Sequence, residues 1–214
     1  WSPNQLPGSL DNAFVTNHGT YTVTLNTSSS VANVIVGATS GAQILLVNGG
    51  ALQNSVVDES GGAQLVFGSG TLDGVMVNGD LDVGNAYNSA RLTVLNGLVL
   101  NGTLYLGHPS NQSWGSVAFA GSQTLSGNGT VVFGNQSSGY NALRLLDGGT
   151  TLTLGPGITV RGQNGTLGYH SAFGGSANVS VVNQGTIAAD VGGGTISLNA
   201  QPFVNSGVIR APNG

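Results

Sequence analysis

The sequence predicts an all-β protein, a single-stranded right-handed parallel β-helix (β-solenoid) of about nine or ten coils. The first observation is a recurring phrase, which reads NGDLDVG at 78–84, NGTLYLG at 101–107 and NGTVVFG at 128–134. Each phrase combines an Asn-Gly turn, an alternating strand and a second glycine that ends the strand. One such strand cannot bury its apolar side chains alone, so the copies are expected to stack on one another.

The second observation is that short alternating segments fill the rest of the chain. VANVIVG (31–37), AQILLVN (42–48) and AQLVFG (63–68) are each bounded by Gly, Asn or Ser, which is the pattern of strands. No window has the 3.6-residue apolar period of a helix. The side chains expected to fill the interior are Val34, Val36, Leu65, Phe67, Leu81, Val83, Leu104, Leu106, Val131, Phe133, Leu152 and Leu154.

The third observation concerns polar insertions that follow the repeated phrase. They read NAYNSA (85–90), HPSNQSWG (108–115), NQSSGYNA (135–142) and, after the imperfect copy NGTLGY at 164–169, HSAFGGSA (170–177). A second alternating strand follows each insertion, so the four insertions are expected to lie above one another at one corner of the solenoid. The phrase LTLGPGITVRG (152–162) is expected to supply an extra coil.

Two domains of unequal size are predicted. Residues 1–18 lack alternation and precede the first clean strand, GTYTVTL at 19–25. They are expected to form an N-terminal cap, because repeat arrays need their open end covered, and residues 19–214 are expected to form the β-helix.

Composition excludes several classes of function. Charged residues make up 6% of the 214 residues and the net charge is −4, so the basic clusters that nucleic-acid binding needs are missing. No apolar stretch is long enough to predict membrane insertion by this segment. There is no cysteine, and His18, His108 and His170 lie far apart without ligand companions, so neither a metal site nor a cofactor is predicted.

Five segments carry a resemblance to known proteins: WSPNQLPGSLDNAFV (1–15), GTYTVTL (19–25), GSQTLSGNGTVVFG (121–134), LTLGPGITVRGQNGTLG (152–168) and NQGTIAADVGGGTISLNA (183–200). They resemble the β-strand-repeat regions of large secreted or surface proteins of bacteria, such as autotransporter passenger rods and filamentous adhesins. The resemblance implies a secreted or cell-surface location and a piece of a longer protein. It implies no particular enzymatic activity.

The insertions hold six of the sixteen aromatic and imidazole side chains of the chain, with Asn and Gln beside them. Aromatic rings can cover the apolar faces of sugars while amides bond sugar hydroxyls, so these loops are candidates for binding glycans or neighbouring cell surfaces. Alternatively, the rings pack the loops onto the rod. The candidate residues are Tyr87, His108, Trp114, Tyr140, Tyr169 and His170, and Phe173 lies in the same fourth insertion.

A polysaccharide lyase or glycoside hydrolase of the β-helix type is the alternative function. Asp80 and Asp82 stand at i and i+2 of one strand, on the same face about 7 Å apart, and Arg91 lies on the following strand. The two acids could equally be exposed charges that support solubility. The principal prediction is a non-enzymatic structural and adhesive segment, whose uncovered coil ends could also associate end to end.

Overall fold

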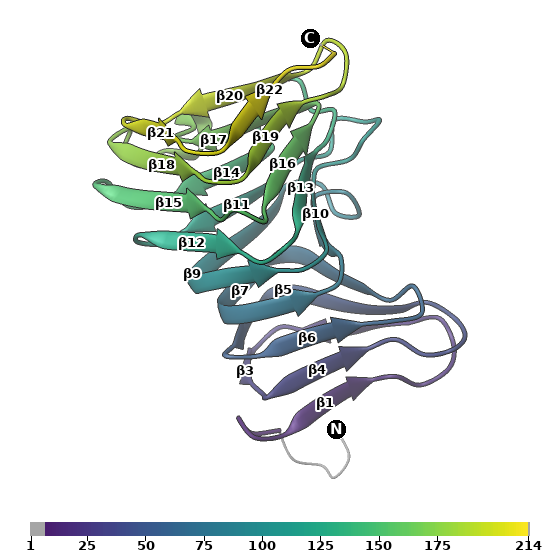
Figure 1. Ribbon diagram of the computed structural model, residues 1–214. Helices are drawn as coiled ribbons and strands as arrows, with labels where there is room; N and C mark the ends of the chain where they lie inside the picture. Colours follow the sequence, from purple (N-terminus) through teal and green to yellow (C-terminus); the bar gives the residue numbers. More distant parts are fainter. Residues whose placement is uncertain (1–6, 214) are drawn as a thin grey trace.

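The computed structural model describes residues 7–213 and shows a parallel β-solenoid of about nine turns, which confirms the predicted fold class. Figure 1 shows the coils stacked from the N-terminal to the C-terminal end, with the two termini at opposite ends of the stack. In the described part of the chain, 22 strands belong to one continuous hydrogen-bonded sheet, and they pair in parallel throughout. The one helical element there is the short 3₁₀ helix η1 (Ser171–Phe173).

Each coil contributes to three stacks of strands, which we call the first, second and third ladders. Three long strands turn corners without a break and so belong to more than one ladder: β5 (Gln43–Gln53), β7 (Gln64–Asn78) and β9 (Ala90–Leu100).

The first ladder contains β1 (Asn12–Val15), β4 (Asn33–Val36), β6 (Val56–Glu59), the ends of β7 and β9, β12 (Gln123–Ser126), β15 (Thr150–Leu154), β18 (Val179–Asn183) and β21 (Phe203–Asn205). The second contains β2 (Tyr21–Leu25), the starts of β5 and β7, β8 (Leu81–Val83), β10 (Thr103–Leu106), β13 (Thr130–Phe133), β16 (Thr159–Gly162), β19 (Thr186–Ala189) and β22 (Val208–Arg210). The third contains β3 (Ser28–Ser30), the end of β5, the middle of β7, the start of β9, β11 (Gly115–Phe119), β14 (Ala142–Leu145), β17 (Asn164–Gly168) and β20 (Thr195–Asn199).

The interior is filled by the alternate apolar side chains of all three ladders. Every one of the twelve side chains that alternation assigned to the interior is at most 3% exposed, which confirms that prediction. Register explains how they stack: Leu81 pairs with Leu104, and Leu104 pairs with Val131 in the next coil. Like side chains therefore lie directly above one another, and the core is one continuous column.

Uncharged amides link the coils where other proteins use charged side chains. Asn33 Nδ2 donates to Asn12 Oδ1 over 2.7 Å, and Asn101 Nδ2 donates to Asn78 Oδ1 over 2.8 Å. Asn183, which is fully buried, donates to Asn205 Oδ1 over 2.7 Å. These amides form hydrogen bonds between coils without the cost of removing a charged group from water, which fits the low content of charged residues.

The predicted arrangement of the insertions is partly wrong. The first three insertions do lie between the second and third ladders, but the fourth, residues 170–177, follows β17 and lies between the third and first ladders. The reason is that 152–162 is no extra coil: it forms the end of β15 and β16, two sides of a coil whose third side is β17. The phrase NGTLGY thus occupies the third ladder, although its earlier copies occupy the second.

The predicted cap, residues 1–18, falls partly on residues 1–6, which lie outside the described residues. Within the described part, residues 12–15 already form β1, which pairs with β4 in register. The first rung of the solenoid therefore begins inside the range assigned to the cap. No helix in residues 7–213 is long and apolar enough to cross a membrane.

Candidate functional site

The outer face of the third ladder carries unusually small side chains in its middle coils. Ser116 and Ala118 of β11 and Ala142 of β14 alternate with interior residues, so they point outward, yet each is at most 3% exposed. Something must therefore cover them. Rings from the insertions lie against Arg91 and Arg144, which pair with Ser116 and Ala118, so these rings share the same outer face.

Four rings gather there, and we call them the aromatic cluster: Trp114, Tyr140, His170 and Phe173. The Trp114 ring lies 5.6 Å from Tyr140 and 5.4 Å from Phe173, measured between centroids. His170 lies 5.3 Å from Tyr140 and 5.2 Å from Phe173. These separations are those of favourable aromatic pairs. All four rings are half-buried, so each keeps part of its surface open to solvent.

The insertions hold one another in place by hydrogen bonds between successive loops. Asn88 Oδ1 of the first insertion accepts from the Trp114 N–H over 3.2 Å. Gln112 Oε1 of the second accepts from the Ser137 N–H of the third over 3.2 Å, and His170 Nε2 lies 3.4 Å from the Ser138 carbonyl oxygen. The fourth insertion thus folds back across the third ladder and meets the third insertion, although it starts at another corner.

Two arginines complete the cluster. The Arg91 guanidinium carbon lies 5.6 Å from the Trp114 centroid and 5.7 Å from that of Phe173, and the Arg144 carbon lies 4.9 Å from the same Phe173 ring. These are cation–π distances. Burial, and to a smaller extent the charge of Arg91, lower the pKa of Arg144 from its usual value.

A polar pocket of about 540 Å³ lies beside the aromatic cluster and shares His170 with it. Its walls come from the third insertion, β17, β20 and the start of the fourth insertion. Hydroxyl and amide groups dominate the lining, including those of Ser138, Thr166, Thr195 and Asn199. The third ladder therefore presents aromatic faces, cations and uncharged hydrogen-bonding groups side by side.

The structure brings together three of the six residues chosen as binding candidates, namely Trp114, Tyr140 and His170. The other three do not join the aromatic cluster. Tyr87 is 46% exposed in the first insertion, His108 Nδ1 accepts from the Ser110 N–H over 3.1 Å, and Tyr169 packs against the apolar core. Arg144 was missed, because an arginine in a strand that reads LRLL has the pattern of an ordinary solvent-facing residue.

The candidates for catalysis do not share one site. Asp80 Oδ1 accepts from the Thr103 N–H over 2.8 Å, and Asp82, which is 7% exposed, accepts from the N–H groups of Asn85 and Ala86. Both acids lie at the second ladder, whereas Arg91 lies on the third, and no ion pair among residues 7–213 joins it to either acid. The two carboxylates are thus used to hold turns and strand starts.

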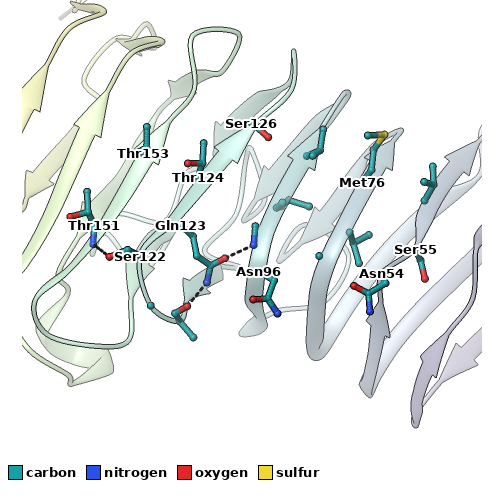
Figure 2. A pocket seen from close by; sticks show the side chains of 18 residues that line it. Asn54, Ser55, Met76, Asn96, Ser122, Gln123, Thr124, Ser126, Thr151 and Thr153 are labelled. Atoms are coloured by element: carbon teal, nitrogen blue, oxygen red, sulfur yellow. Dashed lines mark hydrogen bonds between the residues drawn. The ribbon is translucent and has the colours of Figure 1, made fainter. Parts of the chain in front are cut away.

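A second hollow lies on the outer face of the first ladder. This open groove of about 1050 Å³ crosses the coils from β6 to β15, and Figure 2 shows its lining. Gln123 links two neighbouring turns along the groove: its Oε1 accepts from the Gly97 N–H over 2.9 Å, and its Nε2 donates to the Ala120 carbonyl. The groove has no aromatic or ionisable side chain among its lining residues.

The chain matches no protein-family model, no curated protein and no solved structure. The resemblance to autotransporter and adhesin rods therefore stays a prediction. The features that bear on function are the solenoid fold and the side chains on its outer faces. Within residues 7–213, no group of three or more His, Asp or Glu side chains could hold a metal ion.

Proposed function

We propose that this solenoid is a non-enzymatic, glycan-binding segment of a secreted or cell-surface bacterial protein, and that it binds on the outer face of the third ladder. The observation that carries the proposal is the aromatic cluster beside the 540 Å³ polar pocket. Half-buried rings give a saccharide a preformed apolar platform, because neighbouring rings already hold their side chains in place. The hydroxyl and amide groups of the pocket supply donors and acceptors for sugar hydroxyls.

A stiff rod suits an adhesive role because its binding surface loses little conformational entropy when a ligand binds. The rings come from loops that are hydrogen-bonded to one another and lie on a continuous sheet. A ligand that meets a preformed surface loses less affinity to the ordering of side chains. A solenoid also places such a surface away from whatever it is attached to, which is the geometry that an adhesive segment needs.

The non-enzymatic part of the proposal is supported by the use of the acids. Asp82 is buried and accepts hydrogen bonds from a turn, and Asp80 accepts from the backbone of the next coil. A glycosidase needs two carboxyl groups free to meet the glycosidic bond from opposite sides. We therefore assign Asp80 and Asp82 a structural role and expect Asp80→Asn and Asp82→Asn to leave saccharide binding unchanged.

The test is a saccharide array probed with the wild type and with Trp114→Ala and Tyr140→Ala variants. Each variant is expected to weaken binding of the strongest saccharide at least about tenfold, because aromatic anchors dominate such interfaces. Thr153→Ala, in the groove of the first ladder, is the matched control and should bind as the wild type does. Circular dichroism verifies the fold of each protein. Equal binding by the wild type and both aromatic variants, or no binding at all, would contradict the proposal.

A further inference from the structure

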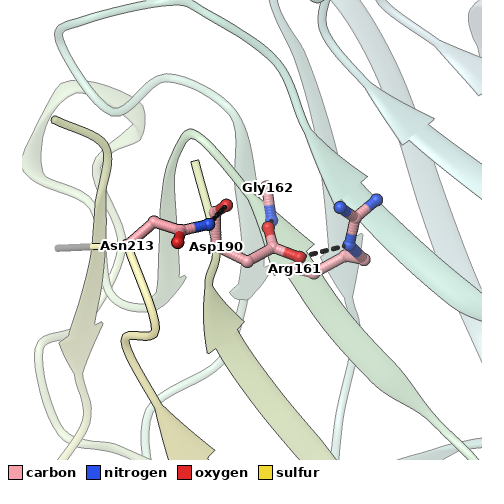
Figure 3. Close-up of polar contacts among 4 residues, drawn as sticks. All are labelled: Arg161, Gly162, Asp190 and Asn213. Atoms are coloured by element: carbon pink, nitrogen blue, oxygen red, sulfur yellow. Dashed lines mark hydrogen bonds and ion pairs between the residues drawn. The ribbon is translucent and has the colours of Figure 1, made fainter. Parts of the chain in front are cut away.

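The four arginines of the chain fall into two kinds. Arg161 Nε donates to Asp190 Oδ2 over 2.6 Å, and Asp190 Oδ1 also accepts from the Gly162 N–H over 3.1 Å, as Figure 3 shows. Arg91, Arg144 and Arg210, by contrast, have no carboxylate oxygen within 4.0 Å in the described part of the chain, and of these Arg91 and Arg144 lie near each other. In a protein with twice as many acids as bases, two adjacent cations without a carboxylate need a reason.

The two arginines also share the same immediate surroundings. Both guanidinium carbons lie within 6 Å of the Phe173 ring, at 5.7 and 4.9 Å, so the two positive charges lie near the same side chain and repel each other. Cation–π contacts offset only part of this repulsion and of the cost of burial. An anion bound by both guanidinium groups would reduce their repulsion and offset the cost of burial.

Two buried polar atoms beneath the rings also lack a partner. Ser116 is 1% exposed and its Oγ makes no hydrogen bond, and Arg144 Nε is buried without an acceptor. Ser116 pairs directly with Arg91 across the ladder, so these atoms lie on the face that the aromatic cluster covers. Buried polar groups without partners are few in folded proteins, and each calls for an explanation, of which a bound water or ion is one.

From this geometry we infer that the outer face of the third ladder takes an acidic glycan, in which a pyranose ring lies on the aromatic cluster and its oxyanion lies between Arg91 and Arg144. The inference rests on the proposed function and names its ligand class. A guanidinium group over a ring keeps its in-plane N–H donors free, and these match a carboxylate in pairs. The neutral pocket beside His170 would then hold the hydroxyls of a neighbouring sugar.

An acidic glycan fits this surface better than other polyanions do. Nucleic acids and acidic peptides need a run of cations, and the chain has only this pair on a background of net charge −4. The oxyanion itself can come from a uronic acid or from a sulfate ester. These two sources share the chemistry of an oxyanion on a pyranose ring.

The test is calorimetric titration of the full chain with tetragalacturonate, with the same tetrasaccharide after reduction of its carboxyls to neutral galactose, and with a sulfated galactose tetrasaccharide. We expect the preferred acidic probe to bind at least about tenfold more tightly than the neutral one, and its affinity to fall as salt is raised. Whichever acidic probe binds more tightly identifies the source of the oxyanion. Arg91→Gln and Arg144→Gln should each weaken it about tenfold or more and change the neutral probe less than about twofold.

Arg210→Gln is the matched control, since it removes the same charge from an exposed residue at the far end of the second ladder. If Arg144→Gln is less stable than the wild type, Arg91→Gln alone tests the inference, because Arg91 is exposed and its replacement should not disturb the fold. Equal affinity for acidic and neutral probes, with both lost in Trp114→Ala, would overturn the acidic preference and leave the proposed function standing. An equal loss in Arg210→Gln would overturn it as well. Binding of no probe would overturn both proposals.

Discussion

The outer faces of the first and third ladders both have a hollow, but the two faces differ in the aromatic and charged side chains that lie at the hollow. The groove of the first ladder is the larger, about 1050 Å³ against about 540 Å³, but it is lined by Ser, Thr, Asn and short apolar side chains without a ring or a charge. The third ladder has the smaller pocket, and beside it lie four rings and two arginines. Volume alone would select the first ladder, whereas the rings and cations select the third.

The difference arises because the loops that enter the two ladders differ in length, whereas the β-solenoid beneath them is the same. On the third ladder, β11 and β14 are preceded by long insertions, and small outward residues such as Ser116 and Ala142 leave room for the rings that these loops carry. Where the groove lies, the first ladder is entered by tight turns, for example at Asn54 and Asn96, which have positive φ angles of 51° and 54°. Tight turns bring no side chains that could cover the sheet.

The largest effect should come from the interior that both faces share. Leu98 lies beneath the first ladder and Leu143 beneath the third, and each is at most 1% exposed. Leu98→Ala and Leu143→Ala should each lower the free energy of unfolding by about 2 to 5 kcal/mol, because each leaves a cavity in the same column. Denaturant unfolding measures this. A loss below about 1 kcal/mol at only one of the sites would show that the two faces do not rest on one core.

A smaller effect should separate the faces themselves. Phe173 contacts three rings and two cations, so Phe173→Ala should lower the free energy of unfolding by about 1 to 2 kcal/mol. Thr153→Ala, on the outer face of the first ladder, should change it by less than about 0.5 kcal/mol. Hydrogen exchange of residues 170–177 should rise in the Phe173 variant. No change in stability or exchange would mean that the aromatic cluster does not hold the fourth insertion.

The first ladder carries a partly buried acid, Glu59, and this predicts a pH dependence. Burial raises the pKa of Glu59 to about 7, although its Oε2 accepts from the Asp80 N–H, and its Oε1 has no partner. The unfolded chain loses this proton near pH 4.5 and the folded chain only near 7, so the free energy of unfolding falls as pH rises between these values.

Glu59→Gln removes that penalty. The variant should be more stable than the wild type by about 1 to 2 kcal/mol at pH 8, a range reduced for partial exposure to solvent, and equally stable below pH 4.5. Urea unfolding at pH 4 and pH 8 measures both values. A variant that is less stable than the wild type at pH 8 would contradict the assignment. Saccharide binding should not change, because Glu59 lies at the end of β6, far along the chain from the aromatic cluster.

The interior was predictable from sequence because alternation reports which side chains share a face, and all side chains of one face meet in a single narrow core. Trp114, Tyr140 and His170 were predictable as a group because their loops follow similar phrases. The position of the fourth insertion was not, since NGTLGY has the sequence of a second-ladder strand and only the pairing of β16 with β13 places it on the third.

Arg144 shows a different limit. Its strand signals that residue 144 points outward, but only the fold brings residue 173 over it and Arg91 beside it, from positions far away in the sequence. The small outward residues Ser116, Ala118 and Ala142 were the one local signal of a covered face. That signal says that something lies above the sheet and does not say what.

The most direct test of the account is the structure of the chain bound to tetragalacturonate or to the sulfated tetrasaccharide, whichever binds more tightly. The account predicts a pyranose ring against Trp114 or Tyr140, with its oxyanion in hydrogen-bonding distance of Arg91 or Arg144 and a neighbouring sugar in the pocket beside His170. A saccharide seated in the groove of the first ladder, away from every ring and every cation, would contradict it.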